Sequence, residues 1–272
     1  MKSTLVVLGV LILTAILIGA ANNDVIIEEK DNREGTVRSV SYNGEGSFSM
    51  KTRAGNWFIK TVDTTNSVGY YTSIALDDKN IPYISYYDST TENLKFAKFD
   101  GSNWNVEIVD EQGDVGKGTS IAVDSSNNIH IGYVDYTNRD SKYAYFNGSA
   151  WTNETVYASG LIAAVYMSIA VDSNDRPHMC WYDQQGGNLR YAYHDGNQWN
   201  NEIAVSTNVV GLFCSIDIAS DDRPHISYYD GTDDDVQYSY KNQSGWQTQK
   251  VDTNGNVGWY TSINWTRTID RI

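Results

Sequence analysis

The chain has 272 residues, of which 20 are Tyr, 8 are Trp and only 3 are Pro, and its formal net charge is −14. This length allows one large domain with a sizeable core, and the abundance of aromatic residues favours strands over helices. The negative charge argues against nucleic acid as a partner, because affinity for phosphates comes largely from Lys and Arg. We expect the acidic surface to keep the protein soluble.

The N-terminal residues have the pattern of an export signal. Lys2 supplies a positive charge, the run from Leu5 to Ile18 is apolar or small, and Gly19-Ala20-Ala21 offers a cleavage site. We therefore predict a signal peptide over residues 1–21, a linker over 22–35, and a secreted or cell-surface location. The run is short for a spanning helix, which needs about 20 apolar residues. An uncleaved membrane anchor is the alternative.

A repeat of about 47 residues dominates the rest of the chain. One marker is a tryptophan and the other is a Ser-Ile pair, and each recurs at spacings of 47 or 48 residues. Two independent markers that hold one period identify a tandem repeat. The tryptophans are Trp57, Trp104, Trp151, Trp199 and Trp246, and the serines are Ser73, Ser120, Ser168, Ser215 and Ser262.

Each repeat unit has the pattern of four short strands. The dipeptide Asp100-Gly101 between the last two segments of the first unit is a strong hairpin signal. Four strands in a tandem unit of this length are the signature of a propeller blade. We expect inter-blade core at Ile74, Ile84, Phe96 and Trp104 and at their equivalents. The strand-like segments of the first unit are residues 72–76, 82–87, 94–99 and 104–109.

The predicted fold is an all-β protein, a β-propeller of four-stranded blades over residues 36–272. A fifth unit begins at Thr261, and the segment before Trp57 is strand-like, so N-terminal strands could complete a composite fifth blade. The span from residue 36 to the end is close to five periods. The four complete units are residues 72–118, 119–166, 167–213 and 214–260.

The last residues, 265–272, do not match the repeat. Back-translated with free choice of codons and read one base earlier, they give Leu-Asp-Ser-Asn-Asp-Arg-Pro-His. This sequence matches residues 171–178 of the third unit at seven of eight positions. We therefore hypothesise a frameshift after Ile263, which would make the fifth blade truncated and leave the natural blade number open. Codons incompatible with the second frame would contradict the hypothesis.

The segments 71–77, 81–88 and 99–104 resemble the tandem propeller repeats of prokaryotic surface proteins, which are similar to fucose-lectin-like and sialidase-type Asp-box propellers. The resemblance covers about residues 36–263 and implies the propeller fold. An Asp-box has the form Ser-x-Asp-x-Gly-x-Thr-Trp between the third and fourth strands of a blade. The equivalent turn here, residues 100–104, lacks the residue between Asp and Gly.

The resemblance to sialidases also implies an arginine cluster, a Tyr nucleophile and an acidic partner. The arginines of the repeats do not recur at one blade position as a set, and we find no Gly-x-Ser-x-Gly, His-Glu-x-x-His or phosphate-loop motif. We therefore expect a protein that is not an enzyme. The arginines considered are Arg139, Arg176, Arg190 and Arg223.

The candidate binding residues lie where each second strand ends. An Asp closes that strand in every unit, on the face where the connector from the preceding blade ends in an aromatic residue, with Gly118 as the exception. Carboxylates accept sugar hydroxyls or coordinate Ca²⁺, and aromatic rings stack on sugars. The alternative is that the aspartates terminate strands in Asx turns and the aromatics pack between blades. The residues are Tyr71, Asp88, Asp135, Tyr166, Asp183, Phe213, Asp230 and Tyr260.

Two further residue sets are interpreted as structural. His130, His178 and His225 share one blade position, where the first unit has Tyr83, so we favour packing over a metal site. Cys180 and Cys214 fall on different strands of adjacent units. Export would permit a disulfide between them, but we favour two buried free thiols.

These patterns predict an exported binding module that presents repeated shallow sites for a glycan. The alternative is a protein-interaction or structural module that binds a surface protein. We expect a monomer that uses no cofactor, with Ca²⁺ as the one ion considered, and that touches a membrane only through an uncleaved anchor.

Overall fold

The structure is a computed structural model that describes residues 5–7, 27–31, 36–40, 49–52, 55–158, 164–207 and 209–265, with side chains described from Ile59 onward except at 164 and 165. The chain divides into two compact units, Met1–Thr64 and Thr65–Ile272. No helix in the described part of the chain is long and apolar enough to span a membrane.

The described residues of the first unit form five short strands. β1 (Leu5–Val7) pairs parallel with β2 (Ile27–Asp31), which pairs antiparallel with β3 (Thr36–Val40). β4 (Ser49–Thr52) and β5 (Gly55–Phe58) form a separate two-stranded sheet. β1 falls within the expected signal peptide, most of which lies outside the described residues. The signal peptide and the domain boundary at residue 36 therefore stay predictions.

The second unit consists of four antiparallel sheets of four strands each, here called blades 1 to 4. Blade 1 contains β6 (Val68–Leu76), β7 (Pro82–Asp88), β8 (Asn93–Phe99) and β9 (Trp104–Asp110). Blade 2 contains β10 (Val115–Val123), β11 (Ile129–Asp135), β12 (Asp140–Phe146) and β13 (Trp151–Ala158).

Blade 3 contains β14 (Ala164–Val171), β15 (Pro177–Asp183), β16 (Asn188–His194) and β17 (Trp199–Val205). Blade 4 contains β18 (Val210–Ile218), β19 (Pro224–Asp230), β20 (Asp235–Asn242) and β21 (Gly245–Asp252). The prediction of an all-β protein with four-stranded blades is confirmed. Whether a fifth blade is composite or truncated stays a prediction.

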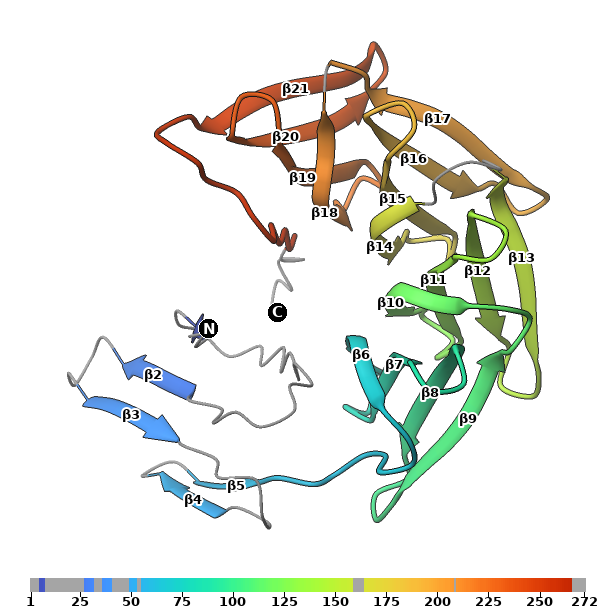
Figure 1. Ribbon diagram of the computed structural model, residues 1–272, viewed down its shortest axis with the longest axis vertical. Coiled ribbons are helices and arrows are strands. Elements are labelled where there is room, and N and C mark those ends of the chain that lie inside the picture. Colours follow the sequence, from blue (N-terminus) through green and yellow to red (C-terminus); the bar gives the residue numbers. More distant parts are fainter. Residues whose placement is uncertain are drawn as a thin grey trace, which may run out of the picture. The chain divides into compact units, whose positions relative to one another are not determined.

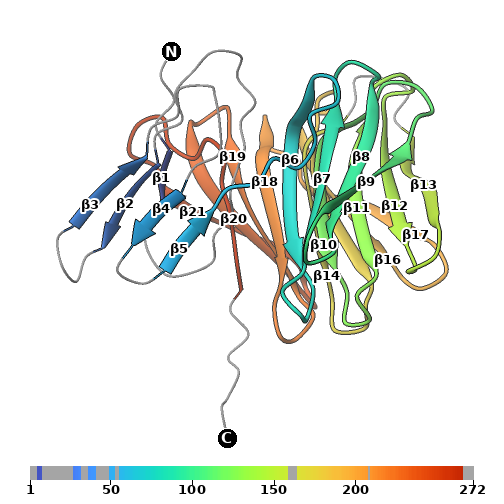
Figure 2. The same ribbon diagram turned by 90° about the horizontal axis from the view of Figure 1, so that it is seen from below.

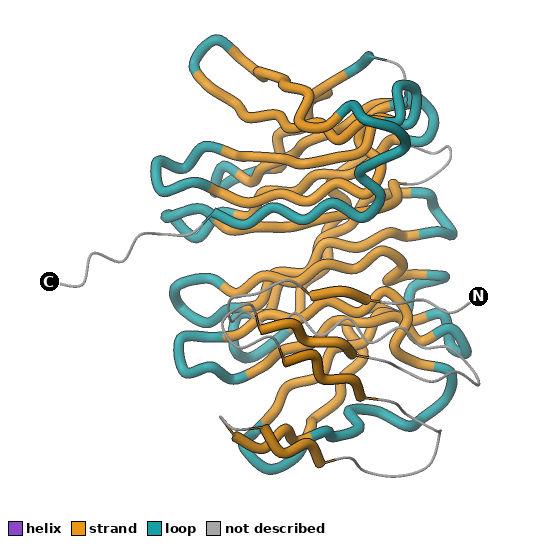
Figure 3. Tube along the Cα trace, turned by 90° about the vertical axis from the view of Figure 1, so that its left-hand side faces the viewer, coloured by secondary structure: helices purple, strands orange, loops and turns teal. Residues whose placement is uncertain are grey.

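The four blades follow one another around an arc, with the first strand of each blade on the inner side and the fourth on the outer side (Figure 1). Figure 2 shows the blades side by side, and Figure 3 shows that their described residues are strands and loops throughout. The strands within each blade are consecutive in the chain, so every connection inside a blade is a hairpin.

The hydrophobic core is divided among the junctions between neighbouring blades. Each of three clusters is formed by two adjacent blades, because a single sheet cannot bury both of its faces alone. The clusters centre on fully buried aliphatic residues such as Leu94, Ile131, Met179, Leu189 and Ile226. Burial of such side chains contributes roughly 2 kcal/mol each, so the junctions hold most of the stability.

The two repeat markers both act across the junctions. The Ser of each inner strand accepts a hydrogen bond from the backbone N–H of the Ile in the next inner strand, and the Oγ–N distances are 3.1–3.3 Å. The Trp of the fourth strand packs edge-on against an aromatic ring of the preceding blade in blades 2, 3 and 4, whereas Trp104 of blade 1 packs on Phe99 of its own blade. The pairs between blades are Phe96–Trp151, Tyr143–Trp199 and Tyr191–Trp246, with centroids 5.0–5.2 Å apart. The period of the sequence is therefore the period of the junctions.

Candidate functional site

One position in each inner strand has an unusual backbone conformation. Tyr71, Tyr166, Phe213 and Tyr260 have positive φ angles of 53–60°, and Gly118 takes the same place in blade 2 with a φ of 60°. In each blade the strand register shifts at this point, which marks a β-bulge. Bulky residues rarely adopt positive φ, and each such residue costs roughly 1–3 kcal/mol.

At three of these positions the aromatic rings lie against one another, whereas the ring of Tyr71 contacts Tyr87 of its own blade. The ring centroid of Phe213 lies 4.0 Å from that of Tyr166 and 4.4 Å from that of Tyr260. The Phe213 ring also stacks on Trp259, with a centroid separation of 5.4 Å. Phe213 is 7% exposed, whereas Tyr166 is 38%, Tyr71 is 55% and Tyr260 is 76% exposed. We call Tyr71, Tyr166, Phe213, Trp259 and Tyr260 the aromatic face.

The electrostatics of Tyr166 link residues that are far apart in the sequence. Burial raises the pKa of Tyr166 above its usual value, and the hydroxyls of Tyr260 and Tyr71 raise it further. These phenols come from blade 1, blade 3 and the segment after blade 4. The phenol of Tyr166 therefore stays neutral and can donate a hydrogen bond at physiological pH.

The four predicted aspartates lie at the ends of the second strands, but their carboxylates are buried and already bonded. Each is at most 6% exposed and accepts backbone N–H groups of the following turn. The other carboxylate oxygen is bonded by Asn66 at Asp88, Asn138 at Asp135, Arg190 at Asp183 and Gln237 at Asp230.

These contacts make Asx turns the observed use of the four aspartates. Burial alone would raise the pKa of Asp88, but hydrogen bonds from Asn66 and the turn outweigh it, so its pKa is lowered. A ligand role for the aspartates stays a prediction. The aromatic residues, by contrast, include exposed side chains that can contact a ligand directly.

The structure also contains a pocket that the sequence did not indicate. It lies between blades 2 and 3, has a volume of about 380 Å³, and is lined by Asn128, Tyr145, Glu154, Asp175 and His194 among others. The corresponding place between blades 3 and 4 holds Arg176 instead of Asn128.

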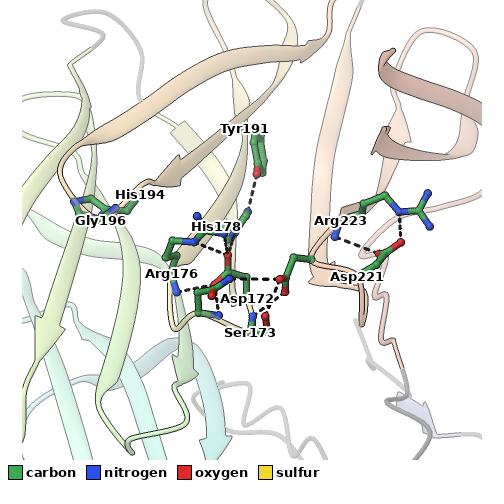
Figure 4. A network of polar contacts seen from close by, with 11 residues as sticks. Asp172, Ser173, Arg176, His178, Tyr191, His194, Gly196, Asp221 and Arg223 are labelled. Carbon is green, nitrogen blue, oxygen red and sulfur yellow. Dashed lines mark hydrogen bonds and ion pairs between the residues drawn. The ribbon is translucent and has the colours of Figure 1, made fainter. Parts of the chain in front are cut away.

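The polar network between blades 3 and 4 shows how the equivalent space is filled (Figure 4). The Arg176 guanidinium bonds Asp172, with 2.7 Å between Nε and Oδ2, and Ser173 donates to Asp222 of the next blade. In blade 2 the shorter Asn128 bonds the equivalent Asp124 at 2.8 Å and leaves the space beyond it open. A single residue difference thus contributes to the pocket.

A second difference lies at the junction tryptophans. Trp151 and Trp246 donate their indole N–H to Glu107 and Glu202 of the preceding blade, at 3.1 and 2.7 Å. The indole Nε1 of Trp199 is buried and has no hydrogen-bond partner among the described residues. Glu154 stands at the position of Glu107 and Glu202, so this polar pair is broken at the junction that has the pocket.

The three junction histidines are packed rather than arranged around a metal. Nδ1 of each lies 2.5–2.7 Å from the hydroxyl of a tyrosine thirteen residues later on the next strand. Burial lowers the pKa of His130, His178 and His225. Within the described residues, no group of three or more His, Cys, Asp or Glu side chains is placed to hold a metal.

The arginines that a sialidase-like site would need are engaged separately. Arg176 bonds Asp172, Arg190 bonds Asp183, and Arg223 bonds Asp221, all within their own blades. Each guanidinium therefore neutralises its own carboxylate, and these three do not form one site for a substrate carboxylate.

Comparison with solved structures identifies similar folds. A mutant of AofleA from Arthrobotrys oligospora superposes with a TM-score of 0.53 and 14% identity, over 81% of this chain and 65% of that chain. A mutant of the Aleuria aurantia lectin AAL, in complex with Fucα1-6GlcNAc, gives a TM-score of 0.51 and 15% identity, over 87% of this chain and 81% of that chain. A protein of unknown function from Dyadobacter fermentans gives a TM-score of 0.50 and 11% identity, over 66% of this chain and 68% of that chain. No family model and no curated protein matches the sequence.

Proposed function

We propose that the protein is an exported, non-catalytic binding module that recognises neutral carbohydrate through the aromatic face. The observation that carries the proposal is the recurrence of an aromatic residue at positive φ in the inner strands. Backbone strain that persists at equivalent positions, three of which carry an exposed side chain, is a mark of function, since packing alone would be served equally well by glycine.

The chemistry of the face suits a neutral sugar. Aromatic rings bury the C–H surfaces of a pyranose, and the phenols of Tyr71, Tyr166 and Tyr260 offer hydrogen bonds to its hydroxyls. The net charge of −14 opposes binding of acidic glycans. Each contact is shallow, so several equivalent positions would act together to raise affinity by avidity. The likeness in fold to a lectin supports the proposal without supplying its ligand.

The alternative is docking of a surface protein on the same face. It is favoured by the exposure of Trp259 and Tyr260, which are 57% and 76% exposed, because aromatic residues are enriched at protein interfaces. A protein partner would bind irrespective of free sugar. This difference separates the two functions experimentally.

The test is glycan-array binding, followed by titration of the best glycan with and without a competing free monosaccharide. Tyr166→Gly copies the residue of blade 2, removes the ring and relieves the positive φ. We expect it to weaken glycan binding at least about tenfold, which corresponds to about 1.4 kcal/mol of binding free energy. We expect no loss of stability, because glycine adopts positive φ without strain. Tyr260→Gly should have the same direction of effect.

The matched control is Ile203→Ala, an exposed apolar residue on the outer strand β17, which should bind as the unmodified protein does. Equal glycan affinity in all these variants would refute the role of the aromatic face. Absence of any glycan ligand, together with sugar-insensitive binding to one protein, would establish the alternative function.

A further inference from the structure

The cysteines of adjacent blades lie in direct contact. Cys180 belongs to β15 of blade 3 and Cys214 to β18 of blade 4, and their Sγ atoms are 2.9 Å apart. The two side chains are 0% and 7% exposed, and both are free thiols in the structure. The expectation that they lie on different strands of adjacent units is correct. Their close approach was not expected.

The equivalent pair of positions forms a side-chain hydrogen bond at two other junctions. Thr119 Oγ1 lies 2.9 Å from Ser85 Oγ between blades 1 and 2, and Ser227 Oγ lies 3.1 Å from Thr261 Oγ1 after blade 4. Between blades 2 and 3 the equivalent residues are Gly132 and Met167, and their contact is apolar. The Met167 side chain occupies the space that a Cβ on Gly132 would need. Between blades 3 and 4 both hydroxyl positions are occupied by cysteine.

We propose that Cys180 and Cys214 form a disulfide that covalently joins blades 3 and 4. The sulfur atoms need to approach by less than about 1 Å to reach the S–S bond length of about 2.05 Å. The equivalent positions already support a side-chain hydrogen bond of similar reach at two other junctions. The disulfide would provide a covalent bond between blades 3 and 4 at the positions where blades 1 and 2 are joined by a hydrogen bond.

The reaction is a thiol–disulfide exchange with a disulfide-bearing oxidant of an oxidising compartment. One cysteine thiolate attacks the oxidant disulfide and releases a thiolate; the second cysteine thiolate then attacks the mixed disulfide. Two cysteine thiols lose two protons and two electrons, and the oxidant leaves as a dithiol. The inference therefore requires the proposed export, but it does not require sugar binding.

The burial of the pair determines when the bond forms. Burial raises the pKa of the Cys180 thiol, and the neighbouring Cys214 raises it further, so the native fold disfavours the reactive thiolate. Oxidation therefore takes place before blades 3 and 4 close on each other. After closure the same burial shields the disulfide from reductants.

The experiment compares the full chain secreted into an oxidising compartment with the same chain made in a reducing cytosol. Each sample is unfolded in iodoacetamide, with or without prior reduction, and weighed intact. The secreted protein should take up two labels, of about 57 Da each, only after reduction, and peptide mapping should join Cys180 to Cys214. The cytosolic protein should take up two labels without reduction.

A stability measurement keeps the test independent of labelling. Reductant that has been allowed to act under partly unfolding conditions should lower the Tm of the secreted protein by roughly 5–10 °C. The double variant Cys180→Ser/Cys214→Thr restores the hydroxyl pair found between blades 1 and 2, so its Tm should not respond to reductant. Two labels on secreted protein without reduction, or a disulfide-linked dimer, would overturn the proposal. Loss of glycan binding alone would not affect it.

Discussion

Two neighbouring junctions, one between blades 2 and 3 and one between blades 3 and 4, share a set of contacts but differ in how the remaining space is filled. In both, an isoleucine backbone N–H donates a hydrogen bond to the serine of the preceding inner strand, and a turn serine donates to an aspartate of the next blade. These shared contacts set the geometry of the arc. The remaining positions of a junction are free to vary, because the shared contacts already hold the blades together.

The variable positions make one junction filled and the other open. Between blades 3 and 4, Arg176 fills the space beside Asp172, and Trp246 is hydrogen-bonded to Glu202. Between blades 2 and 3, Asn128 is short and the indole N–H of Trp199 lacks a partner among the described residues. The backbone is thus repeated from blade to blade, while the side chains that line each junction differ.

The largest expected effect is a loss of stability in mild acid, which reports on the equivalent histidines of blades 2, 3 and 4. Burial lowers the pKa of His130, His178 and His225 in the folded protein below the ordinary histidine value of about 6.5. The unfolded chain therefore binds more protons, so stability is complete above about pH 6.5 and falls as the pH drops below it. Urea unfolding should show a slope of at most about 1.4 kcal/mol per pH unit for each histidine.

The double variant His130→Tyr/Tyr143→Phe isolates the contribution of His130, because it copies Tyr83 and Phe96 of blade 1 and removes one titrating group. The slope between pH 6.5 and 5.5 should decrease by up to about 1.4 kcal/mol per pH unit. An unchanged slope would mean that His130 is protonated equally in the folded and unfolded chains.

An intermediate effect is expected when the junction tryptophans are replaced by phenylalanine. Trp246→Phe removes a hydrogen bond to the Glu202 carboxylate and should cost about 2 kcal/mol, allowing for the partial exposure of that carboxylate. Trp199→Phe loses the same ring volume but no hydrogen bond, so it should cost about 1 kcal/mol less. Chemical unfolding of both variants measures the difference. Equal costs would show that the indole of Trp199 has a partner in solution, such as water.

The smallest expected effect comes from closing the pocket. Asn128→Arg gives blade 2 the residue of blade 3, and the guanidinium can bond Asp124 as Arg176 bonds Asp172. Because such pairs are partly exposed, the free energy of unfolding should rise by no more than about 1 kcal/mol. Thermal unfolding is the measurement, with Asn128→Ala as the control. A clear loss of stability would indicate that the pocket has no room for the side chain.

The sequence predicted the strands of each blade and the packing of the tryptophans, because both depend on periodic patterns. It did not predict the start of the inner strands, which begin three or four residues before the repeat units do, at Val68, Val115, Ala164 and Val210. The bulge at Tyr71 and its equivalents breaks the alternation there, so the preceding residues do not have a strand pattern.

The candidate site was predictable only in part, for a similar reason. An aspartate at the end of a strand is equally typical of an Asx turn and of a ligand, and burial decides between them in space rather than in sequence. The pocket is lined by Asn128, where the next blade has the longer side chain of Arg176. A repeat alignment shows the Asn-for-Arg difference, but only the packed blades show that it leaves a volume.

The inner-strand serines have a consequence for how such genes change. Each blade offers the same hydroxyl to whichever blade follows it, so the acceptor side of a junction does not specify its neighbour. Recombination that adds or removes one whole repeat therefore preserves every remaining bond, whereas a deletion of a few residues within a blade breaks the register. Variation among relatives is thus expected to come in steps of one repeat.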